Sequence, residues 1–297
     1  MSLPTNFFIG RGNVVSPPIP INQTFSPTNT SGRFGTIQSV QALGTYSIQV
    51  IGSQPPQQTF QAPGYQGGSP AHLSGTFTFE EEVTLQLLVG QKPQRQDFSG
   101  GGGGSFVAVG SSYATALPLI VAGGGGSMRV GDCAGQFGSA GGSFSDLDAS
   151  FPTSIGQSNG KNSSFANGGT NGNGGADSNA GEGQAGAGFY GDANGTGSSQ
   201  DIMALSFRNG GVGGLYNSTG SGEGGFGGGG GGGWGGCGAG GGYNGGGAGS
   251  NCVANAAGGG GSYITSSYSS VLNHSALYTA LRQVGGHNGS IIISGGT

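Results

Sequence analysis

Residues 224–242 read GGFGGGGGGGWGGCGAGGG, and this stretch decides what kind of fold the chain can have. Shorter glycine runs occupy residues 100–104, 123–126 and 258–261, and a diluted Asn/Gly/Ala region covers about 159–197. One interpretation is a flexible linker, because glycine loses the most conformational entropy on ordering. The other is an ordered layer, because the runs directly adjoin predicted strands, whose register a loose linker would weaken.

We favour the ordered layer for a reason of backbone chemistry. A glycine segment in the extended threefold helix has no internal hydrogen bonds, so its N–H and C=O groups point sideways. Without Cβ atoms such helices approach closely enough to bond to one another, which predicts a bundle of polyglycine II helices. Phe226, Trp234 and Tyr243 would lie on its rim and are the candidate binding residues, since aromatic side chains dominate binding energy.

The overall composition indicates a chain that can collapse. Glycine fills 74 and proline 12 of the 297 positions, as is typical of low-complexity chains. Disordered chains usually carry many charges, however, whereas 7% of this chain is charged and 33% is hydrophobic. With 16 Phe and 9 Tyr, the chain has the side chains for a core.

The charge and the apolar runs exclude two classes of partner. A net charge of −4 with eight Lys plus Arg argues against nucleic acid, whose binding depends on neutralising phosphates. The longest apolar runs, such as 116–122, are far shorter than the roughly 20 residues that span a bilayer, so no membrane insertion is predicted. The N-terminus lacks the basic region of a signal peptide. We expect an extracellular, cell-surface or virion protein that has lost a leader or is released without one.

Alternating apolar residues predict several short β-strands. Residues 34–43 and 44–52 alternate, with Tyr46, Ile48 and Val50 on one face, and 76–89 continues the pattern around an acidic corner at 80–82. Shorter candidates are 105–109, 117–122, 262–265 and 290–294. Strands separated by glycine and proline predict an all-β fold, an antiparallel β-sandwich of the jelly-roll kind. A short helix is expected near 270–283.

Residues 1–33 form a predicted arm, and 34–297 the glycine-rich domain. Prolines at 17, 18, 20 and 27 exclude a helix and favour an extended backbone that could reach on the order of 100 Å. Such an arm could leave its own domain and add a strand to a neighbouring copy. The apolar residues expected to make that contact are Phe7, Phe8, Ile9, Val14, Val15, Ile19 and Ile21.

Cysteines and sequons give weaker indications. Cys237 and Cys252 are close enough in sequence to form a disulfide, but the third cysteine, Cys133, leaves the pairing open. Candidate glycosylation sites are Asn22, Asn29, Asn162, Asn194, Asn217, Asn273 and Asn288.

Motifs of catalysis are missing, so we expect no enzyme, no cofactor and no metal. The sequence holds no GxSxG, HExxH or CxxC, and its three histidines are scattered. Matches to GxGxxG are an automatic product of polyglycine and carry no information without a βαβ unit. GQSNGK at 156–161 is one residue short of a P-loop. Asp146 and Asp148, or Asp177 and Glu182, could contribute to a calcium site, but solvated loop acids are the expected interpretation.

Several segments, taken in order, resemble a known family. The most specific are LLVGQ at 87–91 and PLIVAGGGG at 118–126, with FSGGGGGSFVAV between them and GHNGSIIIS near the C-terminus. From about 44 to 294 the chain resembles the extracellular glycine-rich region of the anaplastic lymphoma kinase and leukocyte tyrosine kinase receptors. The resemblance implies a tumour-necrosis-factor-like sandwich beside polyglycine helices, and in that family the region binds a protein ligand. Similar glycine-rich modules occur in phage and surface fibre adhesins.

Two functions are therefore expected. One is a structural subunit that assembles head to tail with copies of itself through the arm, building a fibre. The other is an adhesive module that recognises a protein or a glycan receptor through the rim of the glycine bundle. The transmembrane and kinase parts of the receptors are missing, so receptor signalling is not expected.

Overall fold

Almost all regular secondary structure in the described part of the chain is antiparallel β-structure. The computed structural model describes residues 17–29, 32–56, 67–94, 100–129, 149–150, 156–163, 166–177, 183–195, 202–216, 222–233, 236–249, 255–268, 273–276 and 286–296. Within these residues the only helix is the 3-10 turn η1 (Phe207–Asn209). The predicted all-β, antiparallel class is confirmed.

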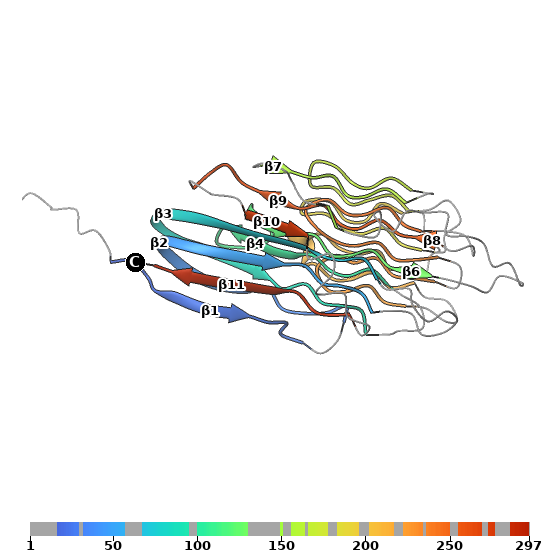
Figure 1. Ribbon diagram of the computed structural model, residues 1–297, viewed down its shortest axis with the longest axis horizontal. Helices are drawn as coiled ribbons and strands as arrows, with labels where there is room; N and C mark the ends of the chain where they lie inside the picture. Colours follow the sequence, from blue (N-terminus) through green and yellow to red (C-terminus); the bar gives the residue numbers. More distant parts are fainter. Residues whose placement is uncertain are drawn as a thin grey trace, which may run out of the picture.

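One sheet holds most of the strands. Their order is β1–β11–β2–β3–β4–β5–β9–β7, with β10 paired to β3. The bounds are β1 Ile21–Phe25, β2 Gln38–Ile51, β3 Ala71–Leu88, β4 Ser105–Val109, β5 Leu117–Ala122, β7 Gly156–Gln157, β9 Tyr263–Ile264, β10 Asn273–Ala276 and β11 Ser290–Gly295. A separate pair joins β6 (Met128–Arg129) to β8 (Asn255–Ala256). The main strands fill one end of the molecule, and long segments of loop that lie side by side fill the other (Figure 1).

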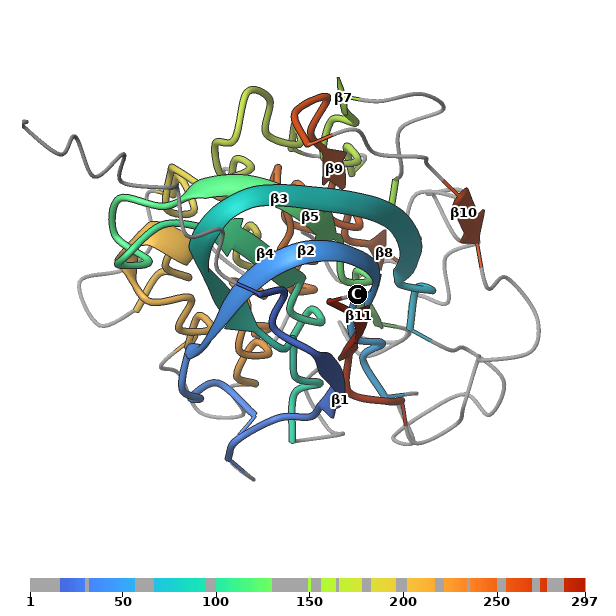
Figure 2. The same ribbon diagram turned by 90° about the vertical axis from the view of Figure 1, so that its left-hand side faces the viewer.

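The two longest strands, β2 and β3, bend together halfway along their length. Residues 38–42 of β2 pair with 83–87 of β3, whereas 44–51 pair with 72–79. The register shifts between Ala42 and Gly44, and Gly44 adopts a φ of +111°, a conformation that favours glycine. Figure 2 shows both strands as arches. The bend therefore curves this part of the sheet.

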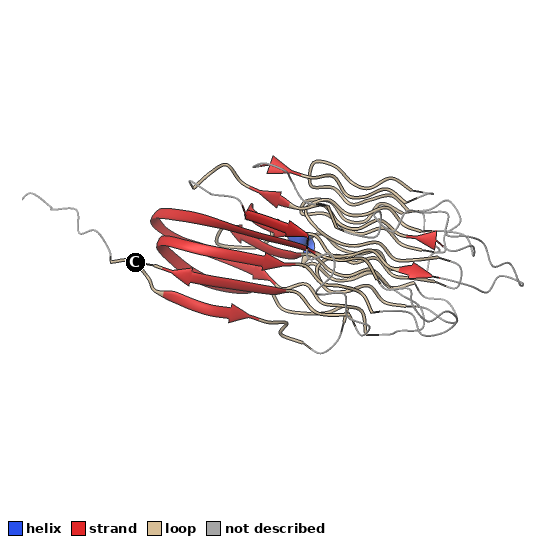
Figure 3. Cartoon of the chain, viewed as in Figure 1, coloured by secondary structure: helices blue, strands red, loops and turns tan. Residues whose placement is uncertain are grey.

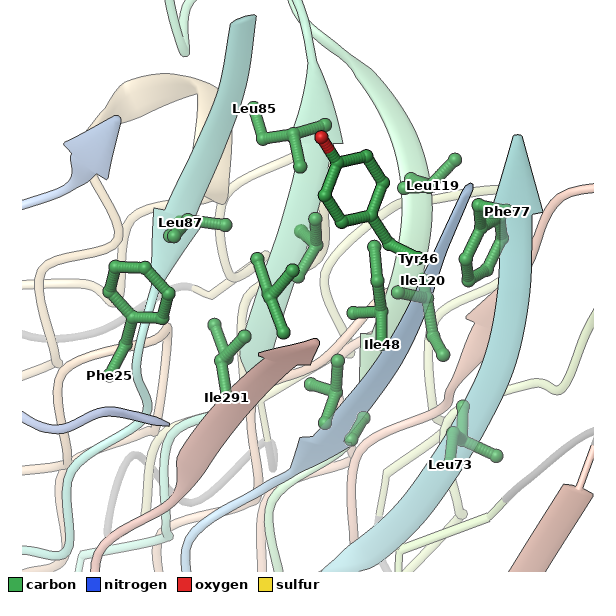
Figure 4. Close-up of a cluster of buried hydrophobic side chains, with 14 of the residues drawn as sticks. Phe25, Tyr46, Ile48, Leu73, Phe77, Leu85, Leu87, Leu119, Ile120 and Ile291 are labelled. Carbon is green, nitrogen blue, oxygen red and sulfur yellow. The ribbon is translucent and has the colours of Figure 1, made fainter. Parts of the chain in front are cut away.

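The main hydrophobic core lies inside this bend. Tyr46, Ile48 and Val50 are fully buried while Ser47 is exposed, so the predicted alternation in β2 is confirmed. Other strands contribute the side chains that Figure 4 shows around them, among them Phe25, Leu73, Phe77, Leu85, Leu87, Leu119, Ile120 and Ile291. The acidic corner at 80–82 is exposed, as expected, because it lies at the bend of β3.

One strand prediction and one helix prediction need correction. The segments 34–43 and 44–52, predicted as two strands, are one strand, β2, that starts at Gln38 and continues through the bend. The helix expected near 270–283 is wrong at Asn273–Ala276, which forms β10 and pairs with 71–74 of β3. Pairing with the edge of a long strand overrides the weak local helix preference. The remainder of that segment lies outside the described residues.

The predicted arm is shorter than 33 residues. Residues 21–25 form β1, which pairs with β11 of the same chain from Ile21↔Gly295 to Phe25↔Ile291. Ile21 and Phe25 are buried in the core, and the Ile19 N–H donates to the Leu43 carbonyl at 3.0 Å. Ile19 and Ile21 therefore contact their own domain. The other predicted contacts of the arm, Phe7, Phe8, Ile9, Val14 and Val15, lie outside the described residues.

Tyr46 fastens the start of the described chain to the bend. Its buried hydroxyl lies 2.6 Å from the Ile19 carbonyl and 2.8 Å from the Leu43 carbonyl, and accepts the Leu43 N–H at 3.0 Å. We expect Tyr46→Phe to lower the free energy of unfolding by about 2 kcal/mol, because buried polar groups lose their partner. Urea denaturation measures the change. Tyr113→Phe, at an exposed ring, is the matched control, and equal midpoints for both variants would contradict the assignment.

Candidate functional surfaces: the glycine layer and the tyrosine groove

The glycine-rich segments lie side by side at the end of the molecule away from the bend, coloured as loop in Figure 3. We call them the glycine layer, and it comprises residues 100–104, 123–127, 183–189, 224–231, 237–249 and 257–261. Two of them continue sheet strands directly: the run at 100–104 leads into β4, and β5 leads into the run at 123–127. The sheet therefore holds the layer in register.

The hydrogen bonds of residues 101–104 follow a repeat of three. The N–H groups of Gly101 and Gly104 donate to Gly230 and Gly227 of one neighbouring segment, each at 2.9 Å. The two residues between them turn to other neighbours, since Gly102 donates to Gly125 and Gly103 to Gln91. Successive residues thus point in three directions, and every third residue returns to the same one.

The tract that contains Cys237 shows the same repeat. Its donor and acceptor pairs are Ala239 to Gln184 and Gly242 to Ala187 for one neighbour, and Gly240 to Gly258 and Tyr243 to Gly261 for another. Donor and acceptor numbers rise together by three, so these segments run parallel to one another. Each segment of the layer is therefore hydrogen-bonded to neighbours in three directions. In a β-sheet, by contrast, each strand is hydrogen-bonded only to the two strands beside it.

Glycine is required at these positions because the backbones nearly touch. A Cβ built on Gly103 would lie 1.7 Å from the carbonyl oxygen of Phe226, and one built on Gly101 would lie 1.9 Å from that of Ala239. Real side chains do not approach oxygen so closely. Within the glycine layer, the alanines place their methyl groups in small buried clusters, such as that of Ala185, Ala187, Ala204 and Ala248.

Aromatic side chains fix the layer to the outer face of the sheet. Alternate residues of a strand point to opposite faces; Val107 of β4 faces the main core, while Phe106 belongs to a second cluster. Phe106 stacks on Phe207 with ring centroids 5.2 Å apart, and Phe207 stacks on Phe189 at 4.8 Å. The other members of this cluster are Leu88, Ala108, Ala116, Val121, Phe226 and Tyr243.

The predicted binding rim is wrong for two of its three residues. Phe226 is 1% exposed and Tyr243 is 8% exposed, so both are anchors between the layer and the sheet. A large side chain cannot fit between glycine segments that nearly touch, so these two rings point out of the layer, and at this position they meet the sheet. The continuous apolar runs SFVAV and LPLIVA are typical of strands covered on both faces and could have indicated this. Trp234 lies outside the described residues.

Three tyrosines that the sequence did not single out line a groove beside this cluster. Tyr190, Tyr263 and Tyr268 meet Val109 of β4 and the first two residues of β5 around an opening of about 240 Å³. We call it the tyrosine groove. Tyr190 and Tyr268 are 37% and 38% exposed.

The rings of the groove are held by their neighbours. Tyr263 stacks on Tyr243 with centroids 4.4 Å apart, and Tyr190 meets Tyr243 edge-on at 6.2 Å. Burial, with the nearby hydroxyls of Tyr190 and Tyr263, raises the pKa of Tyr243 to about 12. The Tyr243 phenol therefore stays neutral at physiological pH. Arg208 lies over the Tyr190 ring at 4.6 Å and donates to the Ala116 carbonyl at 2.8 Å.

Sequons and cysteines are placed only in part. The side chains of Asn22, Asn29, Asn162, Asn194 and Asn288 are exposed, as glycosylation would require. The backbone of Asn273 lies in β10, and Asn217 lies outside the described residues. Cys237 is buried, whereas Cys133 and Cys252 lie outside the described residues, so the Cys237–Cys252 disulfide stays a prediction.

Other chemistry-bearing residues do not gather into a centre. Among the described residues no group of three or more His, Cys, Asp and Glu side chains is placed to hold a metal ion. Asp177 accepts the N–H of Ala185, a residue of the glycine layer, while Asp146, Asp148 and Glu182 lie outside the described residues. The described part of the chain contains no helix that is both long and apolar enough to cross a membrane.

Comparison with known proteins gives no relative by sequence. No protein-family model matches the chain, and no curated protein matches it either. The resemblance to the receptor glycine-rich regions, drawn from the segments quoted above, therefore stays a hypothesis.

Proposed function

We propose that this chain is a structural subunit of an extracellular or virion fibre, in which residues 1–16 pair with the sheet of the next copy. The observation that carries the proposal is the position of the chain's first described residues. Ile19 is bonded to Leu43, and Gly296 donates to the Thr45 carbonyl at 2.8 Å, so both ends of the described chain lie at the bend. The glycine layer occupies the opposite end (Figure 1). A contact made by residues 1–16 would therefore link copies along the long axis.

The proposal includes a finer description of the fold. The bend in β2 and β3, with core side chains on its inner face, supports a jelly-roll-like β-sandwich. The repeat of three in the hydrogen bonds, together with the close backbone approach, supports a bundle of polyglycine II helices. Such a bundle is stiff because its backbone groups bond in three directions, which suits a load-bearing rod.

An acceptor for the arm is available at the edge of the sheet. β1 has a single partner, β11, among the described strands, and its central residues Asn22, Gln23 and Thr24 are exposed. An edge strand accepts an added strand through its remaining backbone groups. Sixteen extended residues span about 50 Å, which is similar to the roughly 45 Å diameter of a compact domain of this size. The arm is therefore long enough to reach the next copy.

The test is a change of side chains in the arm that keeps its length. We expect Phe7→Ser, Phe8→Ser and Ile9→Ser together to convert fibres or large assemblies into single subunits, because the added strand loses its apolar contacts. Light scattering and negative-stain microscopy measure the particle size. The matched control carries Ser2→Ala, Thr5→Ala and Asn13→Ala, which leave those contacts in place. Identical particles from the two variants would overturn the proposal.

A second candidate function is adhesion to a protein or glycan on another surface. The tyrosine groove favours it, because exposed aromatic rings on a rigid support are typical of binding sites. The two functions are compatible, since a fibre can carry binding sites along its length.

A further inference from the structure

We infer that the tyrosine groove binds a neutral pyranose sugar. This inference deepens the second candidate function and does not depend on assembly through the arm. It follows from the size of the groove, from the chemistry of its lining, and from the fact that its lining residues are held in place without a ligand.

The size of the groove selects a small ligand. Its volume of about 240 Å³ is below the range of about 300–1,000 Å³ that is usual for drug-sized molecules. One sugar ring fits that volume, whereas an extended peptide would need a longer channel. The groove also opens to solvent beside Leu117, which is 63% exposed, so further sugar units of a chain could leave it without obstruction.

The lining is amphipathic in the same way as a sugar ring. A pyranose has a face of C–H groups and an edge of hydroxyls, and the electron-rich face of a tyrosine ring attracts the C–H face. Tyr190, Tyr263 and Tyr268 each line the groove with a side chain that is at least partly exposed. Their hydroxyls can therefore donate to and accept from a ligand, as can the Ser267 hydroxyl at the same wall.

The charges around the groove favour a neutral ligand. None of the described residues that line it carries a charge. Arg208 is not a lining residue, and its Nε–H and Nη2–H groups already donate to the Ala116 carbonyl. Through Tyr268 the groove adjoins a second hollow that contains Glu80 and Glu81, and their carboxylates repel an anion. Acidic sugars should therefore bind poorly.

The walls are ordered in advance, which lowers the entropy cost of binding. Tyr268 is one of two described non-glycine residues with positive φ, at +66°, an unfavourable conformation for a bulky residue. Its ring packs on Phe79 with centroids 5.0 Å apart, and its carbonyl accepts the Thr78 N–H at 3.1 Å. Strained residues of this kind cluster at ligand sites, where the surroundings hold them in place.

The experiment titrates the full-length protein with methyl glycosides of glucose, galactose, mannose and N-acetylglucosamine, followed by NMR of the tyrosine ring signals. We expect at least one to bind in the millimolar range, as is usual for so few heavy atoms. Tyr268→Gly removes the ring at a position whose backbone suits glycine, and should weaken binding about tenfold or more. Tyr190→Phe keeps the ring and should weaken binding severalfold, because one hydroxyl is lost.

Control variants and control ligands test whether the sugar binds in this groove. Tyr113→Ala, at an exposed tyrosine outside the groove, should leave the affinity unchanged. N-acetylneuraminic acid should bind at least about tenfold more weakly than the best neutral glycoside. The inference is overturned if no neutral glycoside shifts the signals, if Tyr268→Gly binds as well as the wild type, or if only a peptide of residues 14–20 (VVSPPIP) binds. Particle size does not depend on sugar binding. Failure of the sugar-binding inference is therefore distinguishable from failure of the assembly proposal.

Discussion

Replacing Gly103 by alanine should unfold the glycine layer or lower the free energy of unfolding by about 3–5 kcal/mol. The added methyl group would lie 1.7 Å from the carbonyl oxygen of Phe226, which is backbone and cannot rotate away. Two neighbouring segments would have to separate, and the hydrogen bond from Gly103 to the Gln91 carbonyl, now 3.1 Å long, would be lost with them. Guanidinium denaturation and hydrogen exchange of the layer measure the effect.

Gly249→Ala is the matched control for this substitution. It lies in the same layer, but the nearest atom to its added methyl group is the Cβ of Cys237 at 3.1 Å, a tight contact that small shifts relieve. We expect it to cost about 1 kcal/mol or less. Equal denaturation midpoints for Gly103→Ala and the wild type would show that the layer is loosely packed, which would remove the basis for a polyglycine II bundle.

Replacing Phe226 by alanine should cost about 3–5 kcal/mol of stability. The side chain lies in the second cluster, and its ring fills the space beside Gly35, where an added Cβ would come within 2.5 Å of it. Its backbone is hydrogen-bonded to two other segments, since its N–H donates to the Gly32 carbonyl and its own carbonyl accepts the Gln91 N–H at 2.8 Å. Removing the ring leaves a cavity between the sheet and the layer. Thermal unfolding measures the loss.

Phe34→Ala is the appropriate comparison, because that ring is 47% exposed. It should change the midpoint of thermal unfolding only slightly, as is usual for exposed positions. If Phe226→Ala were as stable as the wild type, the role of Phe226 as an anchor would be refuted, and a place on a binding rim would again be the better interpretation.

The candidate surfaces were harder to predict from the sequence than the strands. Period-two alternation identified residues 46–50 correctly because one side of that strand is buried and the other is not. Phe226 and Tyr243 lie in no such pattern, because their glycine neighbours have no side chains that would indicate which way the two rings point. The tyrosine groove combines Tyr190, Tyr263 and Tyr268 from segments far apart in the chain, and no spacing rule connects them.

The sequence by itself predicted the all-β class and the exposed acidic corner at 80–82, and it favoured an ordered layer of glycine segments over a flexible linker. These follow from local chemistry, because alternation, charge and the missing Cβ act within a few residues. Only the tertiary structure decided that residues 21–25 pair with β11, that Phe226 and Tyr243 face the sheet, and that three tyrosines meet. Each of these three features depends on which distant segments become neighbours. Glycine backbone groups can bond to many different segments equally well, so the neighbours are decided only when the whole chain has packed.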